Sequence, residues 1–208
     1  MVSASASAGG GVPRDDLIEE RRTAIMAAAE QLLAVHGFDA MRLRDVAQQA
    51  GVSIGLIQHY FNTRDELLFE TMRTASRRRA QQWVRLAAGA INASDKITGL
   101  LEGAISDPHR CVIWLETCAA STRHPDLRPD VQLTQAAWRG AIEAAINEGL
   151  AAGEFAPVVP TEDLVLLLVS LIDGLMLATV TENDDGTSQA ERTRVLRETA
   201  QRLVGMAP

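Results

Sequence analysis

The chain has 208 residues, 47% of them hydrophobic and 23% charged, so it can build one good core or two small ones and is not a disordered chain. Only 4% of the residues are aromatic and alanine is abundant, a composition that favours helices over sheets. The net charge of −7 falls on residues 81–208, because residues 1–80 carry 10 Arg and 10 Asp/Glu. A neutral N-terminal part on an acidic body suits a module that faces a polyanion.

The N-terminal segment MVSASASAGGGVP is small and polar, and we expect residues 1–14 to form a disordered arm. It has no apolar run of the kind that export signals need, so we expect a cytoplasmic protein. The spacing of apolar residues then predicts a helix over 15–36, which Gly37 ends. Its predicted apolar stripe is Leu17, Ile25, Ala28, Ala29, Leu32, Leu33 and Val35.

Two short helices are predicted on either side of Gly51, over 43–50 and 54–60. A helix-turn-helix needs a small residue where its helices approach each other, a glycine in the turn and apolar residues at fixed offsets. Ala47 is the small residue, four positions before Gly51. The apolar supports are Val46, Ala50, Val52 and Ile57. These constraints are met in one register and predict a helix-turn-helix rather than an ordinary pair of packed core helices.

The remaining chain is also predicted to be helical, which gives an all-α protein of about nine helices with no alternating strand pattern. Thr63 is expected to cap a helix that runs towards residue 90, and Ser94 and Asp95 are candidate caps for the next one. Later helices are expected over 111–121, over 127–150, from Thr161 onwards and up to about 204, with a turn at 182–188.

The two cysteines, Cys111 and Cys118, lie seven residues apart in an apolar stretch. That spacing places them two turns apart on one helical face, too far for a disulfide, so we expect thiols in a reducing compartment. A zinc site would need further ligands nearby, and the local sequence offers none. We therefore expect no metal and no cofactor.

The longest apolar run, residues 164–180, is interrupted by Asp173 and Gly174 and is short for a bilayer. We interpret it as a helix that is buried nearly all round. A four-helix interface between two subunits would cover it, so a homodimer is expected, and a larger monomeric core is the alternative.

The segment from Arg21 to Leu68, with HGFDAMRLRDVAQQAGVSIGLIQHYFNTRDELL at its heart, resembles the DNA-binding domain of TetR-family regulators. The phrases AAGEF and LIDGL resemble the C-terminal domains of the BetI-like branch of that family. The resemblance implies a DNA-binding domain over 15–64 and a ligand-binding and dimerisation domain over 65–208. It also implies a homodimer that binds a palindromic operator and, in most members, a repressor that a small molecule releases from DNA.

Carried over residue by residue, the resemblance predicts the contacts with double-stranded DNA. Base reading is assigned to Arg44 and Gln58, and Ser53 offers a hydroxyl at a helix N-terminus that favours phosphate. The other expected contacts are Ile54, Gly55 and Leu56 in the groove and Tyr60 and Arg64 on phosphates. Leu56 is equally well a core residue. His59 is included, with a solvated or capping role as the alternative.

Arg42 departs from the family pattern, because a threonine or serine usually caps the second helix at this position. An arginine cannot accept a backbone N–H, so a cap contributing about 1 kcal/mol is lost or replaced. Asp45 still favours the N-terminus of that helix. We interpret Arg42 as an added phosphate contact.

Seven residues of the C-terminal part are candidate ligand contacts: Trp83, Trp114, Glu116, Cys118, Trp138, Asp173 and Met176. Aromatic rings with one or two carboxylates would enclose a cation such as a choline-like molecule. The tryptophans are also ordinary core residues by composition. Asp173 has a second interpretation, as the partner of an arginine across the dimer.

Three functions follow from these observations. The leading one is a ligand-responsive DNA-binding regulator, and the second is a TetR-like sensor or protein-binding module without operator binding. An enzyme is disfavoured, because the sequence lacks a nucleophile elbow, a metal-ligand set and a glycine-rich phosphate loop.

Overall fold

The computed structural model describes residues 14–181 and 188–206. Within these ranges every regular element is helical, and the predicted all-α fold of about nine helices is confirmed. The elements are α1 Arg14–Ala40, α2 Leu43–Ala50, α3 Ile54–Phe61, α4 Arg64–Ala88, α5 Ala93–Ile105, α6 Pro108–Arg123, the 3-10 turn η1 Pro125–Leu127, α7 Arg128–Ala152, α8 Thr161–Thr181 and α9 Gln189–Leu203. Residues 1–13 of the predicted arm and 182–187 of the predicted turn lie outside the described residues.

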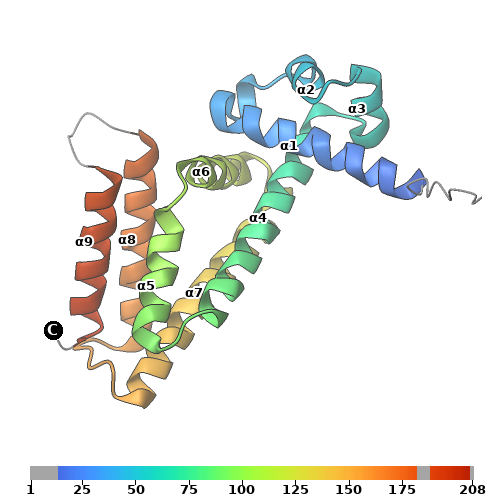
Figure 1. The fold of residues 1–208 in the computed structure, drawn as a ribbon. Helices are drawn as coiled ribbons and strands as arrows, with labels where there is room; N and C mark the ends of the chain where they lie inside the picture. The colour runs from blue at the N-terminus through green and yellow to red at the C-terminus, as the bar shows by residue number, and fades with distance from the viewer. Residues whose placement is uncertain (1–13, 182–187, 207–208) are drawn as a thin grey trace, which may run out of the picture.

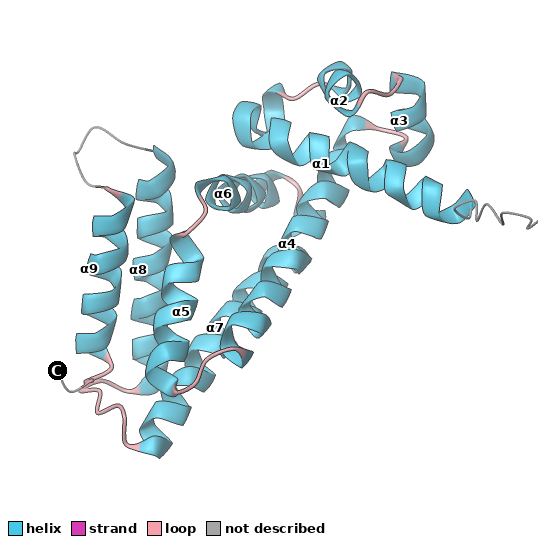
Figure 2. Ribbon diagram, in the orientation of Figure 1, coloured by secondary structure: helices cyan, strands magenta, loops and turns pink. Residues whose placement is uncertain are grey.

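The molecule has an N-terminal unit of three helices and a larger helical body, joined by the long helix α4 (Figure 1). Helices α1, α2 and α3 gather round the N-terminal end of α4, while α5, α7, α8 and α9 form the body around and beside its other end (Figure 1). Helix α6 lies across the end of the body that faces α1, and short loops connect most of the helices (Figure 2). Helix α6 therefore lies between the two parts.

The core of the N-terminal unit does not stop at the predicted boundary between residues 64 and 65. Leu67, Leu68 and Met72 of α4 belong to this core, and so do Ile113 and Ala120 of α6. The remaining buried residues of the core are Ile25, Met26, Ala28, Ala29, Leu33, Phe38, Met41, Val46, Ala47, Ile57, Phe61 and Leu127. The two parts thus share core side chains of α4 and α6, so a movement of either helix would change the packing in both parts.

Helix α1 buries only part of the stripe that its sequence predicts. Leu17 is 41% exposed and Val35 75% exposed, so both expectations were wrong, whereas Ile25 and Leu33 are fully buried. The N-terminal turn of α1 extends beyond its neighbours (Figure 1), which accounts for the exposure of Leu17 but not for that of Val35. Gly37 leaves helical geometry at φ 73°, ψ 173°, so the regular helix ends where predicted.

The phrase AAGEF ties the end of α7 to the start of α5. Gly153 adopts the left-handed conformation and ends α7, and its N–H donates to the Leu150 carbonyl. The following Glu154 accepts from the backbone N–H and the hydroxyl of Ser94, and this hydrogen bonding lowers its pKa. Asn92, and not the predicted Ser94 or Asp95, caps α5 through its side chain, because the Ser94 hydroxyl is taken by Glu154.

Helix α8 is not buried all round in the single chain, contrary to expectation. Leu166, Leu167 and Leu177 are between 47% and 52% exposed, while Leu168 and Ile172 are fully buried. By length and composition the helix could cross a membrane, with a mean hydropathy of 2.3. In the single chain 28% of its most apolar window is buried. One apolar face of α8 is therefore left uncovered by the chain itself.

Candidate DNA-binding and effector sites

The turn between α2 and α3 has the geometry that its sequence predicts. Gly51 is left-handed, at φ 66° and ψ 32°, and the Val52 N–H donates to the carbonyl of Ala47. Val46 and Ile57 are fully buried and Ala47 nearly so. The two helices therefore cross closely over small and apolar residues, as a helix-turn-helix requires.

Helix α3 presents its N-terminal turn to solvent. The Ser53 hydroxyl caps the helix by accepting from the Leu56 N–H at 3.1 Å. Ile54 is 42% exposed, and Gly55 and Gln58 are also exposed. Leu56 is half-buried, between the two roles expected of it. The Ser53 hydroxyl accepts this capping bond and can still donate its own proton to a phosphate. The free backbone N–H groups in the first turn of α3 are also suited to a phosphate.

Two arginines flank the start of α2. Arg42 occupies the N-cap position without a side-chain capping bond, as the substitution of the usual hydroxyl residue predicts. Its side chain and that of Arg44 are exposed, and Arg44 lies 3.4 Å from the Asp45 carboxylate. Both arginines therefore remain accessible to a polyanion.

Arg64 has a structural engagement that the sequence does not reveal. Its guanidinium donates to the carbonyls of Phe38 and Met41, pairs with Asp65 and lies 5.1 Å above the Phe38 ring. It thus holds the end of α1 against the start of α4. The phosphate contact by Arg64 remains a prediction, and such a contact would compete with these bonds.

Two aromatic residues close α3. Tyr60 is half-buried, with its ring edge-on to the exposed His59 at 5.5 Å. Thr63 caps α4 as predicted, accepting from the Glu66 N–H.

A cavity of about 270 Å³ lies between α1, α4 and α6. Its lining is Glu30, Ala75, Ser76, Arg78, Arg79, Gln82, Arg85, Arg110, Ile113, Trp114 and Thr117. Four of these residues are arginines and one is an acid, so the cavity is strongly cationic. It is also the place where both parts of the molecule contribute side chains.

Arg79 is the buried member of this group, only 9% exposed. It donates to the carbonyls of Ala104 and Arg110 and to the Met176 sulfur, and it lies 5.9 Å from the Trp114 ring centroid. Its Nε has no partner. Burial lowers the pKa of Arg79, and no carboxylate among the described residues forms an ion pair with it.

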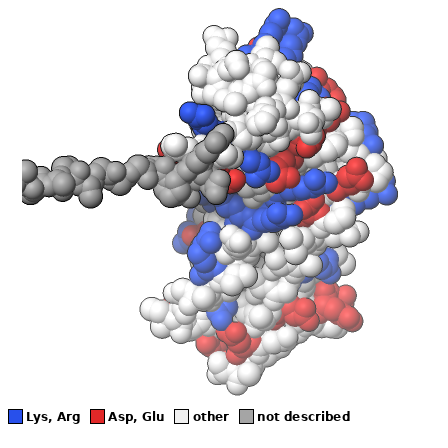
Figure 3. Space-filling view, turned by 90° about the vertical axis from the view of Figure 1, so that its right-hand side faces the viewer, with Lys and Arg blue, Asp and Glu red and all other residues white. Residues whose placement is uncertain are grey.

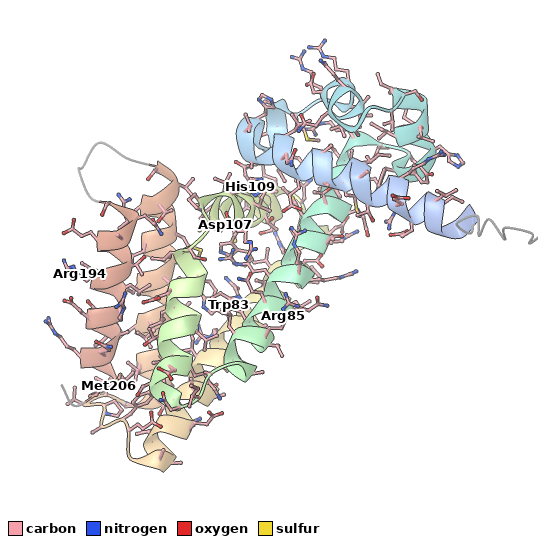
Figure 4. The ribbon with its side chains drawn as sticks, viewed as in Figure 1. Trp83, Arg85, Asp107, His109, Arg194 and Met206 are labelled. Atoms are coloured by element: carbon pink, nitrogen blue, oxygen red, sulfur yellow. The ribbon has the colours of Figure 1, made fainter. Side chains whose placement is uncertain are left out.

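The structure brings four of the seven predicted ligand residues near Arg79. Trp114 and Met176 contact it, and Asp173 and Cys118 lie close enough to affect its pKa. Only Trp114 lines the cavity. Trp83 and Trp138 instead stack in the core of the body at 5.2 Å and 14°, the alternative role that composition allowed. Trp83 points inward from α4, and Arg85, two residues on, lies on the other side of the helix (Figure 4).

The other predicted acidic and sulfur-containing residues do not line the cavity directly. Asp173 lies on the uncovered face of α8, where partial burial still raises its pKa. Met176 is buried and accepts from Arg79. Cys118 packs against the core, and burial followed by the charge of Asp173 raises its pKa to about 12. Cys111 and Cys118 are both free thiols, as predicted.

Glu116 connects the two parts of the molecule instead of facing the cavity. Its carboxylate accepts a hydrogen bond from the Phe38 backbone N–H at 2.9 Å. Phe38 follows Gly37, and a Cβ added to that glycine would lie 3.3 Å from the Glu116 carboxylate. The contact therefore depends on a glycine at 37.

The arginines of the cavity were missed because charged residues on a helix usually indicate a solvated face. The available signal was the phrase SRRR at 76–79, in which three consecutive positions cannot all share one exposed helical face.

A helix-turn-helix on a three-helix unit, joined to a helical body with a cavity at the junction, defines a DNA-binding regulator. Residues 25–71 match the family model of bacterial regulatory proteins of the tetR family, and residues 92–205 match that of the BetI-type transcriptional repressor C-terminal domain. The chain belongs to the TetR family, in the branch with a BetI-type C-terminal domain, and is a transcriptional regulator of that family.

Individual relatives agree with this assignment. The transcriptional regulator BetI of Cronobacter sakazakii is 28% identical over 95% of this chain and 98% of its own length. A TetR-family transcriptional regulator from Rhodococcus sp. has 27% identity and a TM-score of 0.70, covering 90% of this chain and all of the other. A regulator from Saccharomonospora viridis, crystallised with choline, has 24% identity and a TM-score of 0.81, covering 88% of this chain and 96% of its own.

Proposed function

We propose that this chain is a cytoplasmic, homodimeric, non-enzymatic repressor that binds a palindromic operator through α3 and is released from it by a small molecule. The observation that carries the proposal is that α6 lines a cavity with Trp114 and holds the DNA-binding unit through Glu116. An effector in that cavity would act on the same helix that positions the DNA-binding unit.

Recognition of the operator would use few hydrogen bonds. The exposed Arg44 and Gln58 would read base edges, and Ile54 and Leu56 offer apolar contact to thymine methyl groups. Arg42, Ser53, His59, Tyr60 and Arg64 are assigned to the flanking backbone. Sequence-dependent DNA shape would then supply part of the specificity.

Dimerisation is proposed from the uncovered face of α8. Leu166, Ser170, Gly174 and Leu177 follow one another at helical spacing and are all exposed, and the exposed Leu167 lies beside Leu166. This face is mostly apolar, and the exposed Asp173 lies on it beside Gly174. Such a face indicates a protein interface, and the same face on a second copy would cover it by twofold symmetry.

Choline is bound to the Saccharomonospora viridis relative, but the lining of the present cavity differs from what a quaternary ammonium needs. Four arginines would repel a cation, and the acid among them, Glu30, is paired with Arg78. We therefore do not extend choline to this chain.

The test is a mobility-shift assay of the full-length protein on the DNA upstream of its own gene, with excess non-specific competitor. We expect a specific complex, and Gln58→Ala is expected to relax base preference at one or two operator positions while Gln48→Ala on α2 serves as a matched exposed control. A folded dimer that binds no upstream sequence would support the alternative of a sensor without an operator.

A further inference from the structure

The cavity between α1, α4 and α6 has more arginines than ion pairs with acidic residues. Arg78 is paired with Glu30, and Arg110 with Asp107 at 3.0 Å. Neither Arg79 nor Arg85 has an ion-pair partner among the described residues. Two guanidinium groups thus border the cavity without an ion-pair partner, and the Asp173 carboxylate acts on Arg79 only from beyond ion-pair distance.

The position of Arg79 makes this imbalance informative. A guanidinium that is 9% exposed is costly to bury unless its N–H groups and its charge are satisfied. The two carbonyls and the sulfur that it contacts are neutral, and its Nε contacts no acceptor. These bonds orient the group. Because Asp173 lies beyond ion-pair distance, part of the Arg79 charge is left to be matched from the cavity.

Arg85 completes the pattern from the solvent side. It is exposed, lies less than two turns after Arg79 on α4, and borders the same cavity. The face of the molecule seen in Figure 3 shows Lys and Arg side chains gathered across its middle, with some acidic side chains among and above them and others near the bottom. Such an arrangement attracts anions towards this part of the surface.

The cavity also has an apolar wall. Ala75, Ile113 and the indole of Trp114 line it beside the arginines. A volume of about 270 Å³ is at the small end for ligand sites. An occupant would combine a compact apolar or aromatic body with an anionic group.

We propose that the effector is a small organic anion, with its carboxylate or phosphate held by Arg79 and Arg85 and its body against Trp114. This inference rests on the proposed function, because it names the chemical class of the molecule that acts at the same cavity. Planar, multiply donating guanidinium groups suit the oxygen atoms of such anions.

The experiment uses the full-length dimer and matched probes at constant ionic strength: benzoate, benzamide and benzyltrimethylammonium, with inorganic phosphate as the simplest anion. Tryptophan fluorescence reports contact with Trp114, and differential scanning fluorimetry reports stabilisation. We expect benzoate to quench fluorescence and raise Tm, phosphate to raise Tm alone, and the neutral and cationic analogues to do neither.

Variants locate the anion. Arg85→Gln is expected to weaken benzoate binding about tenfold, as expected for the loss of a charge-assisted contact. Arg77→Gln removes the same charge from an exposed position on α4 outside the cavity and is expected to leave binding unchanged. Arg79→Lys retains the charge and is expected to bind benzoate more weakly than the native chain, since the forked donor geometry is lost.

The outcomes separate the two proposals. Three outcomes would overturn the anionic effector and leave operator binding intact. They are tighter binding of benzyltrimethylammonium than of benzoate, an equal loss of benzoate affinity in the Arg77 and Arg85 variants, and no response to either anion. Failure of the mobility shift with anion binding preserved would overturn the operator proposal and leave the anionic site standing.

Discussion

The Glu116 carboxylate accepts a hydrogen bond from the Phe38 backbone N–H, and this contact joins α6 of the body to the segment that ends α1. Phe38 is 3% exposed, so its N–H has little access to water if the acceptor is removed. The same α6 lines the cavity with Ile113, Trp114 and Thr117. One helix therefore borders the cavity and fixes the DNA-binding unit.

Removal of this acceptor is expected to destabilise the chain. Glu116→Ala should lower the free energy of unfolding by about 1–3 kcal/mol, because a buried donor loses a charged partner. Glu116→Gln keeps an acceptor oxygen and should cost less. Urea unfolding followed by circular dichroism measures both, with the exposed Glu143→Ala on α7 as the control. Equal stabilities for the Glu116→Ala and Glu143→Ala variants would contradict the role of the contact.

Gly55 tests how closely α3 approaches DNA. A Cβ at this position would meet only the Ser53 hydroxyl, at 3.9 Å, so Gly55→Ala fits the free protein and should stabilise α3 by up to about 1 kcal/mol. If the helix enters the groove as proposed, operator affinity should nevertheless fall, which fluorescence anisotropy would measure. Gly140→Ala, at an exposed position of α7 with open space, is the control. Unchanged affinity would place Gly55 away from the DNA.

Arg42 is available for phosphate because it takes no part in capping α2. Arg42→Ala should leave stability almost unchanged and weaken binding to all DNA sequences alike. The slope of log affinity against log salt should become shallower by about 1 per operator half-site. A titration of the native and variant proteins at several salt concentrations measures it, and an identical slope would remove the assignment.

The uncovered face of α8 predicts the effect of a charge at its centre. If the chain dimerises through this face as proposed, Leu177→Glu should give a species of 22.4 kDa, because each symmetric interface would bury two added carboxylates. Light scattering after gel filtration measures the mass. Val158→Glu, in the loop before α8 and 93% exposed, should leave the dimer intact. A Leu177 variant that remains dimeric would move the interface elsewhere.

Cys118 should react slowly with thiol reagents. Burial raises its pKa to about 12, so at pH 8 it is protonated, and its reaction with Ellman's reagent should be at least about tenfold slower in the folded than in the unfolded protein. Because the folded state favours the protonated thiol, Cys118 adds to the free energy of unfolding at pH values below the ordinary thiol pKa. This contribution is lost as the pH rises towards about 12. A Cys118→Ser variant separates its signal from that of Cys111, and rapid labelling of Cys118 at pH 8 would oppose this.

The helix-turn-helix was predictable because its geometry fixes residue types at fixed offsets. Gly51 must tolerate a left-handed backbone and Ala47 must be small, and both constraints can be read from the chain alone. The same offsets from Gly51 also indicate which positions of α3 are exposed.

The effector site was not predictable in this way. Composition allows Trp83, Trp114 and Trp138 to be core residues, and all three are buried. It does not indicate which of them borders a cavity, and of the three only Trp114 lines it. That distinction depends on how α4, α6 and α7 pack against one another, which no local pattern determines. The role of Glu116 was hidden for a related reason, since its partner is a backbone N–H 78 residues away.

Helix α4 runs unbroken from Arg64 to Ala88. At its start Arg64 is hydrogen-bonded to the segment that follows α1, and 15 residues later Arg79 borders the cavity. At a rise of 1.5 Å per residue the two positions are about 22 Å apart along the helix. A rod of that length turns a rotation of about 5° at the cavity into a displacement of about 2 Å at its far end. The spacing between the two recognition helices of a dimer, and with it the fit to successive major grooves, would therefore respond to changes that are small at their origin.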